Sequence, residues 1–156
     1  MRFITDTHLG KLAKYLRLLG FDTLHFKEGD DETLEQIARD EERILLTRDR
    51  ALYNWAKAEC YFPINIDTDF QVKEILEHFH LCEACRPFTR CMICNGMVEE
   101  LSDTSSILHL IPPKVKEFNT RYWQCQGCGK IYWHGTHYEK MKQKIDAYCS
   151  KGLNRT

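Results

Sequence analysis

The regular spacing of apolar positions is clearest in the first twenty residues. The short apolar run Phe3-Ile4 ends before Asp6 and predicts a buried strand. Apolar side chains then recur three and four residues apart, the spacing of a helix face that packs on a sheet, at Leu9, Leu12, Ala13, Leu16 and Leu19. Gly20 follows, where a helix C-terminus favours a residue that tolerates positive φ. The stretch therefore predicts a strand and a helix, the opening of an α/β fold.

The same alternation continues to residue 79. Short apolar runs predict three more strands, at residues 22–26, 43–47 and 61–66. An amphipathic segment follows each run and predicts a helix; these helices begin near Asp30 or Asp31, after Asp49, and at Phe70. In the helix after Asp49, we expect Leu52, Trp55 and Ala56 to face the core. Four strands alternating with four helices predict a mostly parallel sheet with right-handed crossovers.

The alternation stops near Leu81, which predicts a division into residues 1–81 and residues 82–156. The second part contains cysteine pairs, Pro112-Pro113 and short aromatic runs, and predicts a small β module held together by metal. No period is evident between Cys94 and Cys125. A final polar helix is expected from Tyr138 to Tyr148, packing back through Met141, Ile145 and Tyr148.

Composition narrows the class of protein. The chain has 156 residues, is 43% hydrophobic, and has no apolar run near the ~20 residues of a membrane helix. Its N-terminus lacks the basic-then-apolar layout of a signal peptide. We therefore expect a cytoplasmic protein with no membrane partner; the sequence does not predict an oligomeric state.

The net charge of -1 hides an asymmetry between the two parts. Residues 1–80 contain 11 Lys and Arg against 16 Asp and Glu, whereas residues 81–156 contain 11 against 7. An acidic half and a basic half fit a metal-binding centre joined to a module that binds a polyanion.

Two C-x-x-C pairs predict a structural zinc site. Cys91 and Cys94 precede Asn95-Gly96, and Cys125 and Cys128 precede Gly129, residues that permit the tight turn around a bound metal. Four thiolates complete a tetrahedron and leave no open position for catalysis. The chain's lack of an export signal favours zinc over disulfides.

The remaining cysteines give no comparable signal. Cys82 and Cys85 form a third C-x-x-C pair without a following glycine, so we interpret them as a helix end or a spare thiol pair. Cys60 and Cys149 stand alone and are interpreted as free thiols.

Acidic residues follow the predicted strands. Asp6, Asp49 and the pair Asp67/Asp69 come after the first, third and fourth strands, and Asp30-Asp31 after the second. Carboxyl ends of parallel strands share one edge of the sheet, where converging carboxylates would bind Mg²⁺ or Mn²⁺ and could support phosphodiester cleavage. The alternative is that each acid only caps a helix.

Basic and aromatic residues suggest where a polyanion would bind. Lys11 and Arg17 lie on the first helix and Arg48 adjoins Asp49; they would hold a substrate phosphate or pair with the carboxylates. His134 and His137 lie in the aromatic run YWHGTHY and suit RNA contact by stacking and phosphate hydrogen bonds. The alternative there is that Tyr132 and Trp133 form the core of the small module.

These motifs together resemble a known family. The segments DTHLGKLAKYLRLLGFDT, DDETLEQIA and RILLTRDRAL resemble the PIN-like ribonuclease domain at the C-terminus of the Mut-seven exonuclease. RCMICNG and WQCQGCGKIYWHGTHYEKM resemble the family's appended zinc ribbon. The resemblance implies an α/β, PIN-like Rossmann-type parallel sheet with helices on both faces, followed by a zinc-ribbon β module.

The resemblance also implies roles for individual residues. The family's metal-binding acids fall on Asp6, Asp31 and Asp49, and a fourth catalytic acid falls on Asp67, with Asp69 as the alternative. His8 stands where the family usually has methionine; we interpret it as a solvent-facing substitution rather than an extra ligand. The Cys82/Cys85 pair is not part of the family motif.

Three functions compete at this point. The leading hypothesis is an Mg²⁺- or Mn²⁺-dependent ribonuclease whose zinc ribbon assists RNA binding. The second is a non-catalytic RNA- or ribosome-binding protein with a degenerate nuclease fold. The third is an adaptor whose ribbon binds a protein, which the basic balance of that half argues against.

Overall fold

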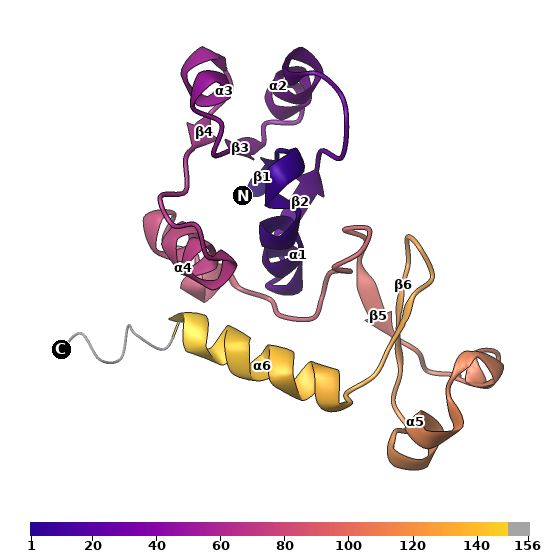
Figure 1. The fold of residues 1–156 in the computed structure, drawn as a ribbon. Coiled ribbons are helices and arrows are strands. Elements are labelled where there is room, and N and C mark those ends of the chain that lie inside the picture. The colour runs from indigo at the N-terminus through magenta and orange to yellow at the C-terminus, as the bar shows by residue number, and fades with distance from the viewer. Residues whose placement is uncertain (150–156) are drawn as a thin grey trace.

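The structure, a computed structural model, describes residues 1–149. Residues 150–156, the end of the predicted second part, lie outside the described residues. An N-terminal α/β domain is followed by a small antiparallel module, and the last helix runs from that module back along the N-terminal domain (Figure 1). None of the described helices has both the length and the apolar character needed to cross a membrane.

The N-terminal domain is a four-stranded parallel sheet, as predicted. Strands β1 (Arg2–Thr5), β2 (Asp22–His25), β3 (Ile44–Leu46) and β4 (Cys60–Tyr61) lie in the order β2-β1-β3-β4. A 3₁₀ turn, η1 (Thr7–Leu9), precedes the first helix. The helices are α1 (Gly10–Leu18), α2 (Asp31–Asp40), α3 (Arg50–Trp55) and α4 (Thr68–His78).

Two apolar layers cover the two faces of this sheet. Phe3 and Ile44 point into a core with α1 and α4, whereas Ile4 and Leu45 point into a second core with α2 and α3. This alternation follows from the two-residue period of a strand. Helices on both faces therefore confirm the expected doubly covered architecture (Figure 1).

The helix predicted from the first twenty residues is confirmed. All five apolar positions of its stripe are buried, with exposures of 6% or less. Gly20 ends the helix with φ +96°, and a Cβ there would lie 2.5 Å from the carbonyl oxygen of Arg86. Glycine is required here both for the left-handed backbone and for the close approach of the linker between the two parts.

Two expectations about the region after β3 are wrong. The fourth strand covers only Cys60–Tyr61 rather than residues 61–66. Pro63 lacks an N–H for a strand ladder, and the N–H groups of Ile64 and Asn65 donate instead to the carboxylate of Glu74. Trp55 does not face inward: it is 52% exposed, because α3 is short and buries only Leu52.

The second part contains the predicted β module, whose strands are antiparallel, and two elements that were not predicted. Strands β5 (Val98–Glu100), β6 (Trp123–Cys125) and β7 (Ile131–Tyr132) pair in sequence order. A 3₁₀ turn, η3 (Leu108–Leu110), and a helix, α5 (Pro113–Phe118), occupy the segment that has no period. They contribute to a small core around Ile107, Ile111 and Tyr122, against which Trp133 packs.

The last helix joins the two parts. Helix α6 (Thr136–Cys149) buries Ile145 and Tyr148 in the core formed with α1 and α4, and Met141 packs against it. The Tyr148 hydroxyl donates to Asp69 over 2.7 Å. The prediction that this helix packs back through these three residues is confirmed.

The first cysteine pair is also fastened to the sheet. Buried Arg17 donates from Nε to the Thr23 carbonyl (2.7 Å) and from Nη1 to the carbonyls of Met92 and Ile93 (3.1 Å each). The Asn95 side chain accepts from the Thr23 N–H (3.0 Å) and donates to Asp22 (2.7 Å). Burial would raise the pKa of Asp22, but hydrogen bonds from Arg43 and Asn95 outweigh it and lower that pKa.

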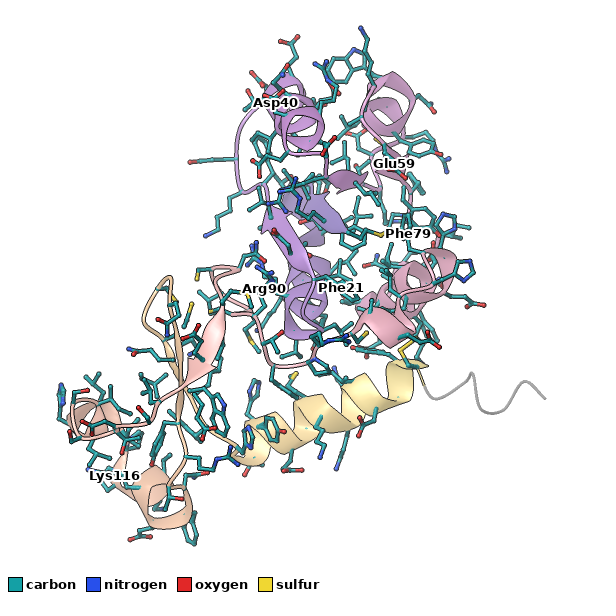
Figure 2. The ribbon with its side chains drawn as sticks, turned by 180° about the vertical axis from the view of Figure 1, so that it is seen from behind. Phe21, Asp40, Glu59, Phe79, Arg90 and Lys116 are labelled. Atoms are coloured by element: carbon teal, nitrogen blue, oxygen red, sulfur yellow. A yellow bond between two sulfur atoms is a disulfide. The ribbon has the colours of Figure 1, made fainter. Side chains whose placement is uncertain are left out.

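One disulfide corrects the interpretation of the cysteines outside the two ribbon pairs. Cys82, in the 3₁₀ turn η2 (Cys82–Ala84), is bonded to Cys149 at the end of α6 (Figure 2). Cys149 is therefore not a free thiol, and Cys82 and Cys85 are not a spare thiol pair. The pairing joins residues 67 positions apart, and it depends on the return path of α6, which spacing alone does not reveal.

The disulfide predicts a difference between two neighbouring cysteine variants. Under non-reducing conditions, Cys82→Ser should lower the free energy of unfolding by about 2–5 kcal/mol, because the loop it closes becomes unconstrained in the unfolded chain. Cys85→Ser is the matched control, since Cys85 is free. Urea unfolding with and without reductant checks this; equal losses in both variants would contradict it.

Arg17 gives a second stability prediction. Arg17→Met keeps the length of the side chain but leaves the carbonyls of Thr23, Met92 and Ile93 without their donor. We expect a loss of about 1–3 kcal/mol in the free energy of unfolding, the cost of buried groups left unpaired. Arg121→Met, which removes an exposed ion pair with Glu100, should barely shift the urea midpoint. A similar shift in both variants would argue against a stabilising role for the hydrogen bonds of Arg17.

Candidate active site and metal centre

Asp6 follows β1 and is 5% exposed. Its Oδ1 accepts from the backbone N–H of His8 (2.9 Å), which caps the short turn before α1. Its Oδ2 accepts from the Thr47 hydroxyl. Each carboxylate oxygen has roughly two acceptor sites, so both oxygens keep capacity for a further partner.

Asp49 lies on the same cleft as Asp6. The two acids line an open cavity of about 510 Å³ together with His8, Lys11, Arg48 and Gln71. Asp49 is exposed and caps α3 through Oδ1, which accepts from the Leu52 N–H (3.1 Å). Thr47 links the two acids, because its hydroxyl donates to Asp6 and accepts from the Asp49 N–H (3.0 Å). We call this cavity the Asp6–Asp49 cleft.

The other predicted acids lie outside this lining. Asp31 is exposed in the first turn of α2, beside the cap Asp30. Asp67 is exposed and caps α4 through the Phe70 N–H (3.2 Å), and its neighbours Ile66 and Thr68 line the cleft. Asp69 accepts from Tyr148 and lies 3.7 Å from Lys144. Between the two candidates for a fourth acid, this geometry favours Asp67, because the Asp69 carboxylate already interacts with Tyr148 and Lys144 of α6.

The predicted basic residues divide into two groups. Lys11 and Arg48 line the Asp6–Asp49 cleft, and Arg48 also donates to the carbonyls of Pro63 and Ile64. Arg17 lies instead at the junction with the first cysteine pair, where its donors face backbone carbonyls. Arg17 therefore has a structural role through backbone carbonyls, and the alternative of pairing with the carboxylates is not seen for it among the described ion pairs.

Asp6 is unusual among the buried carboxylates. The described residues contain two acids below 9% exposure, Asp6 and Glu35. Glu35 forms an ion pair with Arg39 at 2.7 Å, whereas no cation lies within 4.0 Å of Asp6 among the described residues. Burying a charge without an opposite charge is unfavourable. A cation in the cleft would offset that cost.

The donor set fits a hard divalent ion. Mg²⁺ prefers oxygen ligands and is often held by one or two carboxylates, with waters and substrate phosphates completing the octahedron. Asp6 and Asp49 provide such a pair. The cleft does not bring three acids this close together. Among the described residues, the four ribbon cysteines are the group of three or more potential ligands whose ligand atoms all lie within 4.8 Å of one another.

Thr47, His8 and Gln71 are cleft residues that sequence reasoning did not assign to the site. His8 was interpreted as solvent-facing; it is exposed and also borders the cleft. Thr47 ends the third predicted strand, and a hydroxyl beside Arg48-Asp49 was an available signal. Gln71 lies one turn into α4 and gives no signal of its own.

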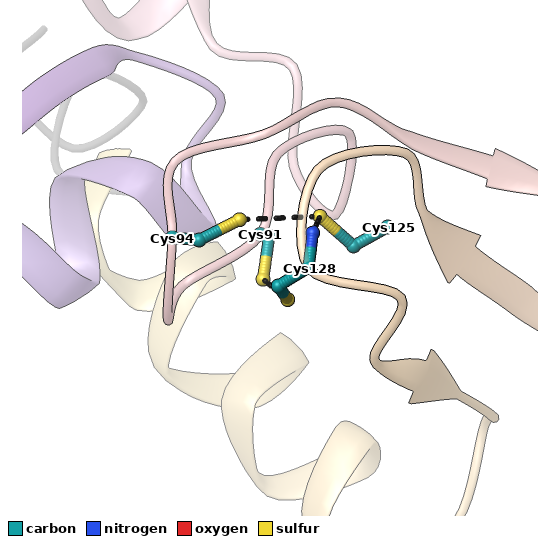
Figure 3. Close-up of side chains that lie close together, drawn as sticks. All are labelled: Cys91, Cys94, Cys125 and Cys128. Atoms are coloured by element: carbon teal, nitrogen blue, oxygen red, sulfur yellow. Dashed lines mark hydrogen bonds between the residues drawn. The ribbon is translucent and has the colours of Figure 1, made fainter.

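The four ribbon cysteines meet in one cluster (Figure 3). The Sγ atoms of Cys91 and Cys128 are 3.8 Å apart, and those of Cys94 and Cys125 are 3.3 Å apart. Tetrahedral zinc with bonds of about 2.3 Å places its sulfur ligands about 3.8 Å apart. The cluster can therefore hold a metal ion such as zinc.

The backbone around the cluster is shaped for close approach to sulfur. A Cβ on Gly96 would lie 2.9 Å from the Cys125 Sγ, and one on Gly127 would lie 3.1 Å from the Cys94 Sγ. Asn95 and Gly129 adopt positive φ, as the sequence predicts for these turns. Burial raises the pKa of the Cys125 thiol, but hydrogen bonds from the Cys128 N–H, Cys94 and the Gly127 N–H lower it to about 7. These donors favour the thiolate at Cys125, whereas burial raises the pKa of its donor Cys94 to about 11.

The two predicted RNA-contacting histidines lie beside a second cavity. The His134 ring stacks on Trp123 (centroids 4.0 Å apart) and on Tyr138 (3.7 Å). Both faces of His134 are therefore covered, which leaves its edge for hydrogen bonding. His137 is exposed in the first turn of α6.

The geometry agrees with one comparison. No curated protein and no solved structure shows a significant match to the chain. The family model described as "Mut7-C RNAse domain" matches residues 1–145, which include the parallel sheet, the Asp6–Asp49 cleft and the four-cysteine cluster. The chain therefore belongs to the Mut7-C RNAse domain family.

Proposed function

We propose that this protein is a divalent-metal-dependent ribonuclease that hydrolyses RNA phosphodiester bonds at the Asp6–Asp49 cleft. The observation that carries the proposal is Asp6, a buried carboxylate that has no cation within 4.0 Å in residues 1–149 and faces a cleft that a second carboxylate also lines. Membership of an RNase family supports the choice of RNA as the substrate.

Each residue of the cleft has a distinct task in this proposal. Asp6 and Asp49 hold Mg²⁺ or Mn²⁺, while the Thr47 hydroxyl orients the Asp6 carboxylate and the Leu52 N–H orients the Asp49 carboxylate. Lys11 and Arg48 neutralise the scissile and neighbouring phosphates. When bound, the ion would lower the pKa of a coordinated water, which makes that water a better nucleophile, and would stabilise negative charge on the phosphodiester oxygens. Asp31 and Asp67 remain predictions from the family resemblance, as auxiliary acids at the edge of the cleft.

The second part is proposed to be a zinc ribbon that assists RNA binding. Four clustered thiolates suit structural zinc because they leave no open coordination position. The net positive charge of that half supports contact with phosphates. The proposed setting is the cytoplasm, where zinc sites are common and RNA is present.

Asp49→Asn separates the ligand from the cap. Asparagine caps a helix about as well as aspartate, so the free energy of unfolding should change little. Changing a residue that only supports a metal ligand typically reduces activity about 10–100-fold. Loss of the ligand itself should therefore reduce Mg²⁺- or Mn²⁺-dependent RNA cleavage by more than that. Cleavage of labelled RNA and a thermal melt of the same sample check both expectations.

Asp30→Asn is the matched control, because Asp30 caps α2 in the same way, by accepting from the Thr33 N–H at 2.7 Å. It should cleave RNA at the wild-type rate. If Asp49→Asn also cleaves at that rate, the acids act as caps only, and the non-catalytic RNA-binding function takes the place of the ribonuclease.

The zinc proposal predicts about one zinc per chain, as one four-ligand site requires. Cys125→Ser should lose the zinc and unfold the module around it, since metal binding supplies much of the folding free energy of such small modules. Cys60→Ser should retain zinc; burial raises the pKa of the Cys60 thiol to about 11, so it stays protonated. Elemental analysis and circular dichroism check this. Zinc-free protein with an intact second part would contradict it.

A further inference from the structure

A second cavity, of about 340 Å³, lies between the C-terminal module, α6 and α1. We call it the ribbon cavity. It shares no lining residue with the Asp6–Asp49 cleft. Its volume is at the lower end of the range of small-molecule pockets, about 300–1,000 Å³, which suits a ligand the size of one nucleotide.

The lining of the ribbon cavity is basic. Lys14, Arg90 and Lys130 line it together with His134 and His137, and its described lining includes neither Asp nor Glu. Lys14 and Lys130 are exposed, so both can reach a bound anion. A cavity with this charge attracts an anionic ligand, and no acidic side chain of its described lining would repel a phosphate.

Arg90 contributes a fixed cation to the lining of the ribbon cavity. Its Nη1 donates to the Asn95 carbonyl over 2.9 Å, which holds the guanidinium at the junction of the two parts (Figure 2). No acidic side chain forms an ion pair with it among the described residues. Its positive charge therefore remains available to attract an anion to the cavity.

Aromatic side chains supply the other half of nucleotide recognition. Trp123, His134 and Tyr138 form a parallel stack with centroid spacings of 4.0 and 3.7 Å. This stack makes a rigid wall, and Tyr132 and Trp133 provide further aromatic surface in the same cavity. Flat rings beside fixed cations are the features that bind unpaired bases and their phosphates.

Helix α1 connects the two cavities. Lys11 lines the Asp6–Asp49 cleft, whereas Lys14 and Leu18 line the ribbon cavity. These positions are spaced i, i+3 and i+7 and therefore lie along one face of the helix. Lys11 to Leu18 spans about 10 Å at a rise of 1.5 Å per residue. A short RNA strand can follow this face from one cavity to the other.

We propose that the ribbon cavity binds one unpaired nucleotide of a single-stranded RNA and so holds the strand along α1 with its scissile bond at the Asp6–Asp49 cleft. This rests on the proposed ribonuclease function. The base occupies the aromatic part of the cavity, and Lys14 and Lys130 contact the phosphates beside it.

Binding by the zinc-loaded full chain, in buffer without added Mg²⁺ or Mn²⁺, tests the proposal. The probe is a fluorescein-labelled single-stranded oligoadenylate, followed by anisotropy. Lys14→Ala combined with Lys130→Ala should weaken binding about 10-fold or more. It should also reduce the slope of log K against log salt by about 1.4, because each phosphate contact on a single strand contributes about 0.7. Lys114→Ala with Lys116→Ala, which removes the same charge from exposed positions on α5, should change affinity less than about 2-fold on the same electrostatic reasoning.

Tryptophan fluorescence tests whether a base enters the cavity. In a Trp55→Phe background, the remaining Trp123 and Trp133 both line the ribbon cavity. The oligoadenylate should quench their emission, and the same strand paired into a duplex should bind more weakly and quench less. Binding without quenching, or duplex affinity equal to that of the single strand, would overturn base capture.

Three further results would overturn the proposal in other ways. Free AMP that binds as tightly as the oligoadenylate would identify a site for free nucleotides instead of RNA. Equal losses in the two double-lysine variants would place the RNA contact outside the ribbon cavity. Absence of binding by either probe would leave the cavity to a protein partner and end the nucleotide proposal.

Failure here is distinguishable from failure of the ribonuclease proposal. If cleavage requires Asp49 but the ribbon cavity binds no nucleotide, only the present inference falls. If the oligoadenylate binds through Lys14 and Lys130 while Asp49→Asn still cleaves at the wild-type rate, only the ribonuclease proposal falls.

Discussion

Arg17, buried in α1, donates to the carbonyls of Met92 and Ile93, the two residues between the first pair of ribbon cysteines. Asn95, directly after that pair, bonds to the edge strand β2 through Thr23 and Asp22. The loop that supplies half of the four-cysteine cluster is therefore also the loop that docks on the sheet. A metal ion held by this cluster would order the docking loop as well, and α6, held by Tyr148 and the Cys82–Cys149 disulfide, packs on the N-terminal domain at its other end.

The parts of the fold that depend on local spacing could be predicted from the sequence. The leucine stripe of α1, the strands β1 to β3 and the glycine-backed cysteine turns each have a period or a turn signal within a few residues. The features that were missed depend on distant parts of the chain. Pro63 and the hold of Glu74 on Ile64 shorten β4, and the partner of Cys82 lies 67 residues away. The helix α5 has six residues, of which only Val115 is partly buried, so it is too short to show a period.

For the candidate site, the edge of the sheet on which the acids lie was predictable, but the hydrogen-bond and stacking partners of individual side chains were not. Acids after parallel strands were expected on one edge, and Asp6 and Asp49 do share a cleft. Sequence order could not show that Arg17 turns toward the cysteine loop, or that Asp69 turns toward Tyr148. Nor could it show that the His134 ring is covered on both faces. In each case a neighbour contributed by a remote segment decides which atoms remain available.

The sequence leaves open whether the acids act as helix caps or as metal ligands. At Asp49 the two roles use different carboxylate oxygens, so they do not exclude each other. Asp49 caps α3 with Oδ1, and capping fixes the orientation of the carboxylate without using its second oxygen. Asp6 is held through both oxygens, because Oδ1 accepts from the His8 N–H and Oδ2 accepts from the Thr47 hydroxyl, so both acids are positioned before any ion binds. Capping therefore orders these two carboxylates on one cleft while each keeps lone pairs for a further partner, which is the arrangement a pair of carboxylates needs to bind a divalent cation.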